Sequence, residues 1–328
     1  MGRLKIVYPV CCGMDVHRDF LIACIAATNA QGVTEYQSRR FSTYTGSLRE
    51  LRDWLLANDC KDVCMESTGK YWFPVHNILE GSCHVVVSHP KFVKAIKGKK
   101  TDKKDAQWIA DLFKHDLVRG SFIPPKDIRQ LRDLCRYWVK LSSYMTGEKN
   151  RAQNCLTVSN FKLDDVFSNV FGKSASAITT QLLEHPGEQF DVAPFVDGRC
   201  KTPIAQIQEA VDGIFTYEQA EKLKIIRGHM DSLERHKAEL ESLILEIAQN
   251  YLPQIELLLT VPGIHDAFTA IRILAEIGAD MTVFDTSKHL CSWAGLTPQN
   301  AESAGKKKTT RIGKSGAYLK PLLIQVAL

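Results

Sequence analysis

The chain has 328 residues, of which 45% are hydrophobic and 24% are charged, and its formal net charge is +5. This length can hold two domains with separate cores, and the composition is typical of a globular protein rather than a fibrous or disordered one. No apolar run reaches the ~20 residues that a membrane helix needs, and residues 1–10 lack the apolar core of a signal peptide. We therefore expect a cytoplasmic protein without a membrane partner.

The 10 cysteines lie singly in apolar runs or in pairs without the spacing of a zinc site. Nothing in the sequence indicates secretion. We therefore expect reduced and mostly buried thiols.

Apolar patterns in the first 123 residues predict an α/β domain. Two β-favouring runs, Val10 to Val16 and Phe20 to Ala27, are joined by His17-Arg18-Asp19, which predicts a hairpin. The elements expected after it are a strand at Tyr36 to Ser42, a helix capped by Ser47, a strand at Asp62 to Glu66, a helix at Trp72 to Glu80, a strand at Cys83 to Val87 and a helix at Asp102 to Lys114. A three-strand antiparallel meander, extended by parallel strands through helical crossovers, predicts the ribonuclease-H-like (RNase H-like) fold.

The rest of the chain is predicted to be mainly α-helical. Beyond Pro124-Pro125, an apolar stripe from Leu131 to Met145 indicates a helix, whereas Phe161 to Pro203 shows no clear pattern. Tyr217 to Leu252 predicts one long helix. Its apolar side favours either a coiled coil between chains or a helical hairpin within the chain, with self-association slightly preferred. We expect three domains: residues 1–123, residues 124–256 and residues 257–328.

Four carboxylates lie where this fold would bring them together. Asp15 is on the first strand, Glu66 ends the fourth strand, and Asp102 and Asp105 open the last helix of the domain, on one helical face. Carboxylates are ligands that suit Mg²⁺, and two such ions would support phosphoryl transfer. Structural roles stay open as alternatives: a capping box for Asp102 and Asp105, a turn for Asp15 and a helix cap for Glu66.

Basic residues form two clusters, a pattern typical of proteins that bind the phosphate backbone. The predicted nucleic-acid-binding residues are Lys97, Lys99, Lys100, Lys103, Lys104, Lys306, Lys307, Lys308, Arg311 and Lys314. A solvated surface is the alternative for either cluster alone. Because each cluster flanks a candidate catalytic element, the two together favour nucleic acid.

Short motifs, in the same order along the chain, resemble those of one known family. The N-terminal motifs are Gly13-Met14-Asp15-Val16-His17, Met65-Glu66-Ser67-Thr68-Gly69-Lys70-Tyr71-Trp72 and Lys100-Thr101-Asp102-Lys103-Lys104-Asp105-Ala106. The C-terminal motifs are Trp293-Ala294-Gly295-Leu296-Thr297-Pro298, Ser303-Ala304-Gly305-Lys306, and Arg311-Ile312-Gly313-Lys314-Ser315-Gly316 with Tyr318-Leu319-Lys320. They resemble the DEDD transposases related to the Piv/MooV DNA invertases, that is, the insertion sequence 110 family of bridge-RNA-guided recombinases.

The resemblance implies a RuvC-like N-terminal domain that binds Mg²⁺, with Mn²⁺ as an alternative, through Asp15, Glu66, Asp102 and Asp105. It implies that Ser303 is the nucleophile and forms a transient phosphoserine link to DNA. The implied partners are double-stranded donor and target DNA, a structured non-coding guide RNA and further copies of the chain in a dimer or tetramer. The implied setting is the nucleoid of a bacterium.

Without the family resemblance, the residues around Ser303 give weaker support for its role as the nucleophile. A free serine is a weak nucleophile that needs activation. The Ser/Gly/Lys composition around it is more often that of a flexible loop, and Ser292 and Ser315 compete with it for the role.

Two other features of the C-terminal region bear on function. Val261-Pro262-Gly263-Ile264, followed by a helix at Ala267 to Ile277, resembles a helix-hairpin-helix element whose backbone amides could hold a DNA phosphate. His265 stands where such hairpins carry a second glycine, so helix packing is an equal alternative. Family members usually continue beyond Leu328, which makes truncation of the chain a further hypothesis.

Together, the residues and the family resemblance imply an RNA-guided DNA recombinase that uses Mg²⁺-assisted attack by a serine. Two alternatives stay open. One is a RuvC-like, structure-specific nuclease that uses the acidic residues alone, and the other is a non-catalytic nucleic-acid-binding protein.

Overall fold

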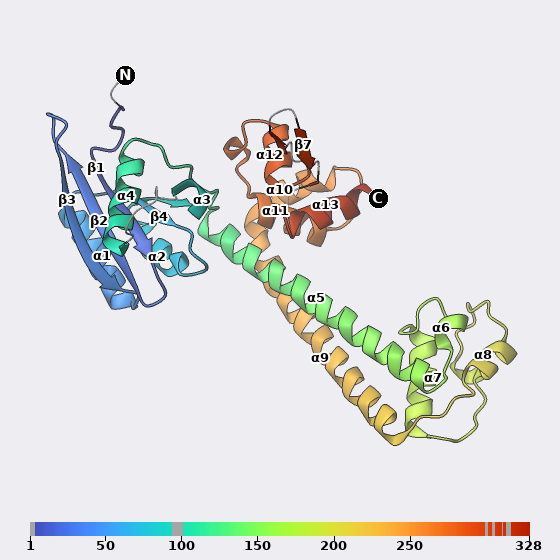
Figure 1. The fold of residues 1–328 in the computed structure, drawn as a ribbon. Coiled ribbons are helices and arrows are strands. Elements are labelled where there is room, and N and C mark those ends of the chain that lie inside the picture. Colours follow the sequence, from blue (N-terminus) through green and yellow to red (C-terminus); the bar gives the residue numbers. More distant parts are fainter. Residues whose placement is uncertain (1–3, 94–100, 299–300, 304–305, 310, 313–315) are drawn as a thin grey trace. The chain divides into compact units, whose positions relative to one another are not determined.

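The computed structural model describes residues 4–93, 101–298, 301–303, 306–309, 311–312 and 316–328. The chain forms two compact units, Met1–Ile123 and Pro124–Leu328 (Figure 1), which are described separately. Within the described residues, no helix is both long and apolar enough to cross a membrane. All 10 cysteines are free thiols, and most are buried, as the sequence predicts.

A five-stranded sheet forms the centre of the first unit. Its strands, in chain order, are β1 (Val10–Val16), β2 (Phe20–Thr28), β3 (Thr34–Ser42), β4 (Asp62–Glu66) and β5 (His84–Ser88). The spatial order is β3-β2-β1-β4-β5. The first three strands pair antiparallel, whereas β4 runs parallel to β1 and β5 runs parallel to β4. This is the RNase H-like arrangement, so the predicted fold class is confirmed.

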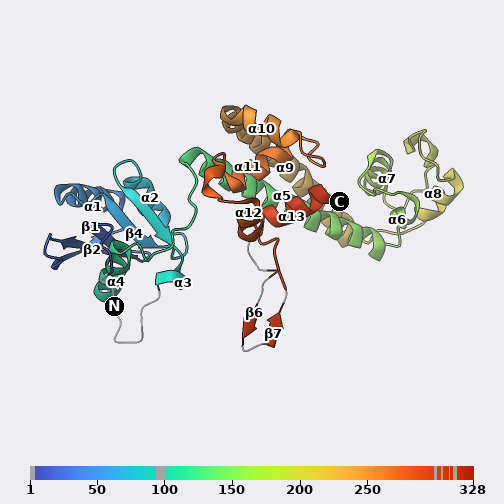
Figure 2. The ribbon, with the colours of Figure 1, turned by 90° about the horizontal axis from the view of Figure 1, so that it is seen from above.

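Helices cover both faces of this sheet (Figure 2). α1 (Thr45–Ala57) and α2 (Trp72–Leu79) lie on one face, and α4 (Asp102–Lys114) lies on the other. α4 packs directly on β1 because Gly13 has no side chain: a Cβ at this position would lie 2.2 Å from the Ala110 nitrogen. The short helix α3 (Pro90–Val93) follows β5.

Most of the predicted element ends agree with the structure, and the β1–β2 hairpin is confirmed. The prediction that Ser47 caps the first helix is wrong, because α1 begins at Thr45 and has Tyr44 at its N-cap. The Ser47 hydroxyl instead accepts a hydrogen bond from the Ser42 backbone N–H at 3.1 Å. This bond fixes the link between β3 and α1.

Two long helices, α5 (Lys126–Val158) and α9 (Tyr217–Ala248), lie side by side in the second unit (Figure 1). Leu131 of α5 shares one core with Leu233 and Leu240 of α9. The apolar face of α9 therefore packs within the chain, as the hairpin alternative describes.

The segment between α5 and α9, for which the sequence shows no clear pattern, is a small helical subdomain. It contains α6 (Leu163–Val166), α7 (Lys173–Glu184), the 3₁₀ turn η1 (Ala193–Phe195) and α8 (Ile204–Ala210). Their apolar side chains share a second core with one end of α5 and α9.

The C-terminal region packs around the other end of the two long helices. Its elements are η2 (Gln249–Tyr251), α10 (Leu252–Leu259), α11 (Ala267–Ile277), η3 (Met281–Val283), α12 (Ser287–Trp293), β6 (Ala301–Ser303), β7 (Lys306–Thr309) and α13 (Leu319–Ala327). β6 and β7 pair antiparallel. The division of the second unit at residue 256 stays a prediction.

Candidate active site

Asp15 lies near the end of β1, on the face that α4 covers. Side chains alternate along a strand, and Cys11 on this strand packs in the core beneath α4. Asp15 is four residues further on and points to the same side. Its side chain is only 15% exposed. The close approach of α4 at Gly13 therefore encloses a carboxylate at the carboxyl end of the central strand.

The start of α4 brings two further carboxylates to this place. Thr101 is the N-cap, and its hydroxyl accepts a hydrogen bond from a backbone N–H in the first helical turn. The capping-box alternative for Asp102 and Asp105 is therefore wrong, since both residues lie inside the helix. The alternative for Glu66 is wrong as well, because Tyr71 stands at the N-cap of α2.

Asp15, His17 and Asp102 form the tightest part of the site. The His17 Nε2 atom lies 3.1 Å from Asp15 Oδ2 and 3.8 Å from Asp102 Oδ1. One potential ligand atom from each residue lies within 4.8 Å of the other two. Among the described residues, Glu66 and Asp105 lie outside this group of three, although the sequence predicts them as ligands.

Burial and neighbouring negative charge raise the pKa of Asp15 above the ordinary value of 3.8. Burial has the largest effect, because desolvation disfavours the ionised carboxylate. His17 opposes the shift through its charge and its hydrogen bond, whereas the charges of Asp102 and Asp105 add to it. Without a cation, the ionised form of Asp15 is therefore disfavoured at this site.

Glu66 neighbours Asp15 across the sheet. β4 runs parallel to β1 with Met65 opposite Met14, and both methionines lie in the core on the α1 and α2 side. The next residue of each strand, Glu66 and Asp15, points to the opposite face. The Thr68 hydroxyl lies 3.3 Å from Glu66 Oε1 and donates a hydrogen bond to it.

Two transposase family models match the chain. DEDD_Tnp_IS110, described as a transposase, matches residues 12–160, and a second model, described as the transposase IS116/IS110/IS902 family, matches residues 255–328. The chain belongs to the IS110 transposase family. It is therefore a DNA-processing enzyme of insertion sequences, as the sequence motifs predict. The first matched segment carries the four acidic residues, and the second carries Ser303.

Two solved structures have some similarity to the transposase. RuvC from Thermus thermophilus is 14% identical with a TM-score of 0.28, and the match covers 34% of this chain and 99% of RuvC. Fowlpox virus resolvase, in a complex with substrate Holliday junction DNA, is 14% identical with a TM-score of 0.22, and the match covers 32% of this chain and 72% of the resolvase. No curated protein sequence matches the transposase. The fold assignment rests on the strand order given above.

His17 is the site residue that the sequence reasoning missed. The sequence pattern assigns it only to the hairpin turn and to a family motif. A signal was present, because residues two apart on a strand share one face and His17 is two residues from Asp15.

The structure describes the predicted nucleophile of the transposase and some of its predicted basic residues. β6 ends at Ser303, and the backbone of Ser303 pairs with that of Lys306 in β7, which also carries Lys307 and Lys308. Lys103, Lys104 and Arg311 are exposed. The remaining predicted phosphate contacts lie outside the described residues: Lys97, Lys99, Lys100 and Lys314.

The helix-hairpin-helix-like segment of the transposase uses its glycine inside the protein. Gly263 has a φ of +90°, and a Cβ there would lie 2.1 Å from the Val326 carbonyl oxygen. The close backbone approach at Gly263 thus serves the packing of α13. Asp266 caps α11 and accepts a hydrogen bond from the Thr269 N–H at 2.8 Å. These contacts favour the packing alternative for this segment.

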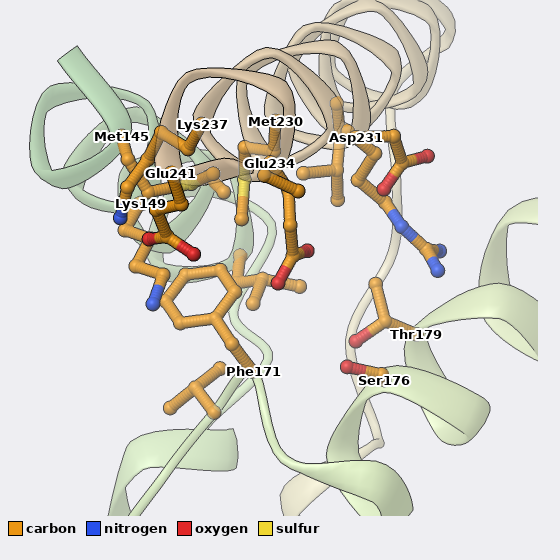
Figure 3. Close-up of a pocket in the computed structure, with 16 residues that line it drawn as sticks. Met145, Lys149, Phe171, Ser176, Thr179, Met230, Asp231, Glu234, Lys237 and Glu241 are labelled. Carbon is orange, nitrogen blue, oxygen red and sulfur yellow. The ribbon is translucent and has the colours of Figure 1, made fainter. Parts of the chain in front are cut away.

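A pocket of about 610 Å³ lies among α5, α7 and α9 of the second unit (Figure 3). None of the predicted site residues lines it. Two of its cations have aromatic neighbours in the chain: Lys237 Nζ lies 4.3 Å from the Trp138 ring centroid, and Lys149 Nζ lies 5.5 Å from that of Phe171. Acidic residues, among them Asp231, balance these charges, so we assign no ligand to this pocket.

Proposed function

We propose that the transposase is a metal-dependent DNA recombinase in which the acidic residues of the first unit hold a divalent cation and Ser303 is the nucleophile. The observation that carries the proposal is the meeting of Asp15 and Asp102 with His17, in which one potential ligand atom from each residue lies within 4.8 Å of the other two. Burial raises the pKa of Asp15, His17 opposes this rise, and the charges of Asp102 and Asp105 add to it. Such a group costs free energy unless a cation offsets it.

The donor set fits Mg²⁺. Carboxylate oxygens are hard ligands of the kind that Mg²⁺ prefers. One carboxylate oxygen of Asp15 and one of Asp102 lie within 4.8 Å of each other in the group that these residues form with His17. Glu66 and Asp105 would complete the set with further oxygens. A bound cation would stabilise negative charge at the scissile phosphate and on the leaving oxygen.

The proposed roles of the other residues follow from their chemistry. Lys103 and Lys104, exposed at the start of α4, would hold DNA phosphates next to the acidic site. The lysines of β7 would do the same beside Ser303. In the cleavage step, a bond forms between Ser303 Oγ and phosphorus while the bond from phosphorus to a deoxyribose oxygen breaks. The serine proton passes to solvent, and the released sugar oxygen takes one up.

Target choice and assembly belong to the same proposal. Family resemblance supports a structured guide RNA that pairs with donor and target DNA. It also supports a homo-oligomer in which the acidic site of one subunit meets Ser303 of another. The two basic clusters are consistent with nucleic-acid partners of either kind.

A RuvC-like nuclease is the second candidate. The observation in its favour is that the acidic site is assembled entirely from residues of the first unit. Water could then replace the serine as the nucleophile. A non-catalytic binding protein is the third candidate, and it gives no role to the charge crowding at Asp15.

One set of variants separates the three candidates. The protein is purified with its bound RNA and incubated with insertion-junction DNA and Mg²⁺, and covalent protein–DNA adducts are measured on denaturing gels. We expect an adduct for the wild type and for the control Ser292→Ala, no adduct for Ser303→Ala, and neither cleavage nor adduct for Asp15→Asn, which should still bind DNA. Cleavage that survives Ser303→Ala would support the nuclease. Binding without cleavage in every variant would support the third candidate.

A further inference from the structure

We infer that His17 is a nitrogen ligand of the cation held by Asp15 and Asp102, and that it raises the affinity of the site for Mn²⁺ relative to Mg²⁺. The inference rests on the proposed function, because it requires that the acidic site holds a cation. It adds a residue and an ion preference that the four carboxylates alone do not provide.

The position of the His17 ring is the first argument. Nε2 lies close to two carboxylates from different elements, at hydrogen-bond distance (3.1 Å) from Asp15 Oδ2 on β1 and 3.8 Å from Asp102 Oδ1 on α4. The ring is 39% exposed, so it could turn towards solvent. It instead keeps one potential ligand atom within 4.8 Å of a carboxylate oxygen from each of the two aspartates.

Contacts of the ring and backbone hold this orientation. The backbone N–H of His17 donates to the Phe20 carbonyl oxygen at 2.9 Å, which closes the hairpin. The His17 ring centroid lies 4.7 Å from that of Phe20. The Arg40 guanidinium covers the Phe20 ring at 4.0 Å from its centroid. A ligand fixed in this way loses little conformational entropy when it binds an ion.

The chemistry of imidazole sets the ion preference. Mg²⁺ is a hard cation that takes oxygen ligands almost exclusively. First-row transition ions accept imidazole nitrogen more readily than Mg²⁺ does, and Mn²⁺, which also suits carboxylate oxygens, stands at the weak end of their affinity order. Replacing one oxygen of an all-carboxylate centre by His17 Nε2 therefore favours Mn²⁺ over Mg²⁺.

A different role for His17 makes the opposite prediction. If His17 only supplies positive charge to Asp15 and Asp102, it competes with the cation. Its removal would then strengthen the binding of both ions to a similar degree. The effect of His17→Ala on two ions therefore distinguishes a ligand from a counter-charge.

The test uses the full chain without nucleic acid. Mn²⁺ and Mg²⁺ are titrated by calorimetry into the wild type, His17→Ala and His17→Asn, whose folding is checked by circular dichroism. We expect the Mn²⁺ affinity to fall on the order of tenfold in both variants, the lower end of what losing a supporting group costs a metal site. The Mg²⁺ affinity should change less than about threefold. Pulsed electron paramagnetic resonance of bound Mn²⁺ should show nitrogen coupling in the wild type and none in either variant.

His84 provides a matched control. At the opposite end of the same sheet, His84 Nδ1 lies 2.9 Å from Asp62 Oδ1 in a similar histidine–aspartate pair. His84→Ala should leave both affinities and the nitrogen coupling unchanged. Equal changes for the two ions in the His17 variants, or no nitrogen coupling in the wild type, would overturn the inference.

Asp15→Asn separates this inference from the proposed function. It should abolish the binding of both ions. If it does so while the His17 variants bind normally, the acidic site stands and the role of His17 is wrong. If the wild type binds neither ion, the metal site of the proposed function fails, and the inference fails with it.

Discussion

The substitution Gly13→Ala tests how the contact between β1 and α4 builds the acidic site. The added Cβ would lie 2.2 Å from the Ala110 nitrogen and 2.3 Å from the Ala106 carbonyl oxygen. Both atoms belong to the backbone of α4, which must therefore move away from β1 by roughly 1 Å to reach ordinary contact. Overpacking of this kind costs typically ~1–3 kcal/mol. The same movement carries Asp102 and Asp105 away from Asp15.

Hydrogen exchange measured by mass spectrometry reports the stability of peptides from β1 and α4 in the whole chain. We expect faster exchange in Gly13→Ala, together with weaker binding of Mn²⁺. Gly46→Ala is the control, because nothing lies within 4 Å of a Cβ at Gly46 in α1. Wild-type exchange and wild-type Mn²⁺ affinity in Gly13→Ala would refute the argument that this close contact positions the carboxylates.

Three other substitutions have defined outcomes. Asp15→Asn should make the metal-free protein more stable at neutral pH in denaturant titrations. Burial raises the pKa of Asp15, so its ionised form lowers the stability of the folded wild type at neutral pH. The stability gained by Asp15→Asn should disappear as the pH falls towards the ordinary pKa of 3.8. Arg136→Ala should lower the free energy of unfolding by about 1–3 kcal/mol. It removes two hydrogen bonds of 2.7 Å to the Glu276 carboxylate, and the Glu276 side chain is only 9% exposed. An unchanged denaturation midpoint would contradict this prediction. Gly263→Ala should speed proteolysis of the C-terminal region, since its Cβ would lie 2.1 Å from the Val326 carbonyl oxygen, and wild-type resistance would argue against this packing.

The first unit could be predicted from the sequence because its signals are local. Apolar strands bounded by turn residues leave few other arrangements, and the helix from Asp102 to Lys114 has the predicted ends, although its N-cap is Thr101 and not Asp102. The prediction of Ser47 as a helix cap is wrong because serine is common in turns as well as at helix caps. Its hydroxyl bonds to the Ser42 N–H, a contact that the pattern of helix caps does not show.

Features set by contacts between distant segments were harder to predict. The apolar stripe of α9 is equally suited to a second chain or to α5, and only the fold shows that α5 covers Leu233 and Leu240. The sequence could place Asp15 and Asp102 near one another through the fold class. The sequence could not show how closely α4 approaches β1, which depends on the absence of a side chain at Gly13. It could not show the role of His17 either, because that role depends on the orientation of the ring.

Diffraction from crystals soaked in Mn²⁺ tests the central claim most directly. At a wavelength where manganese scatters anomalously, the account predicts a peak at bonding distance from carboxylate oxygens of both Asp15 and Asp102. A crystal that takes up no manganese there, with Asp15 still paired to His17 alone, would contradict it.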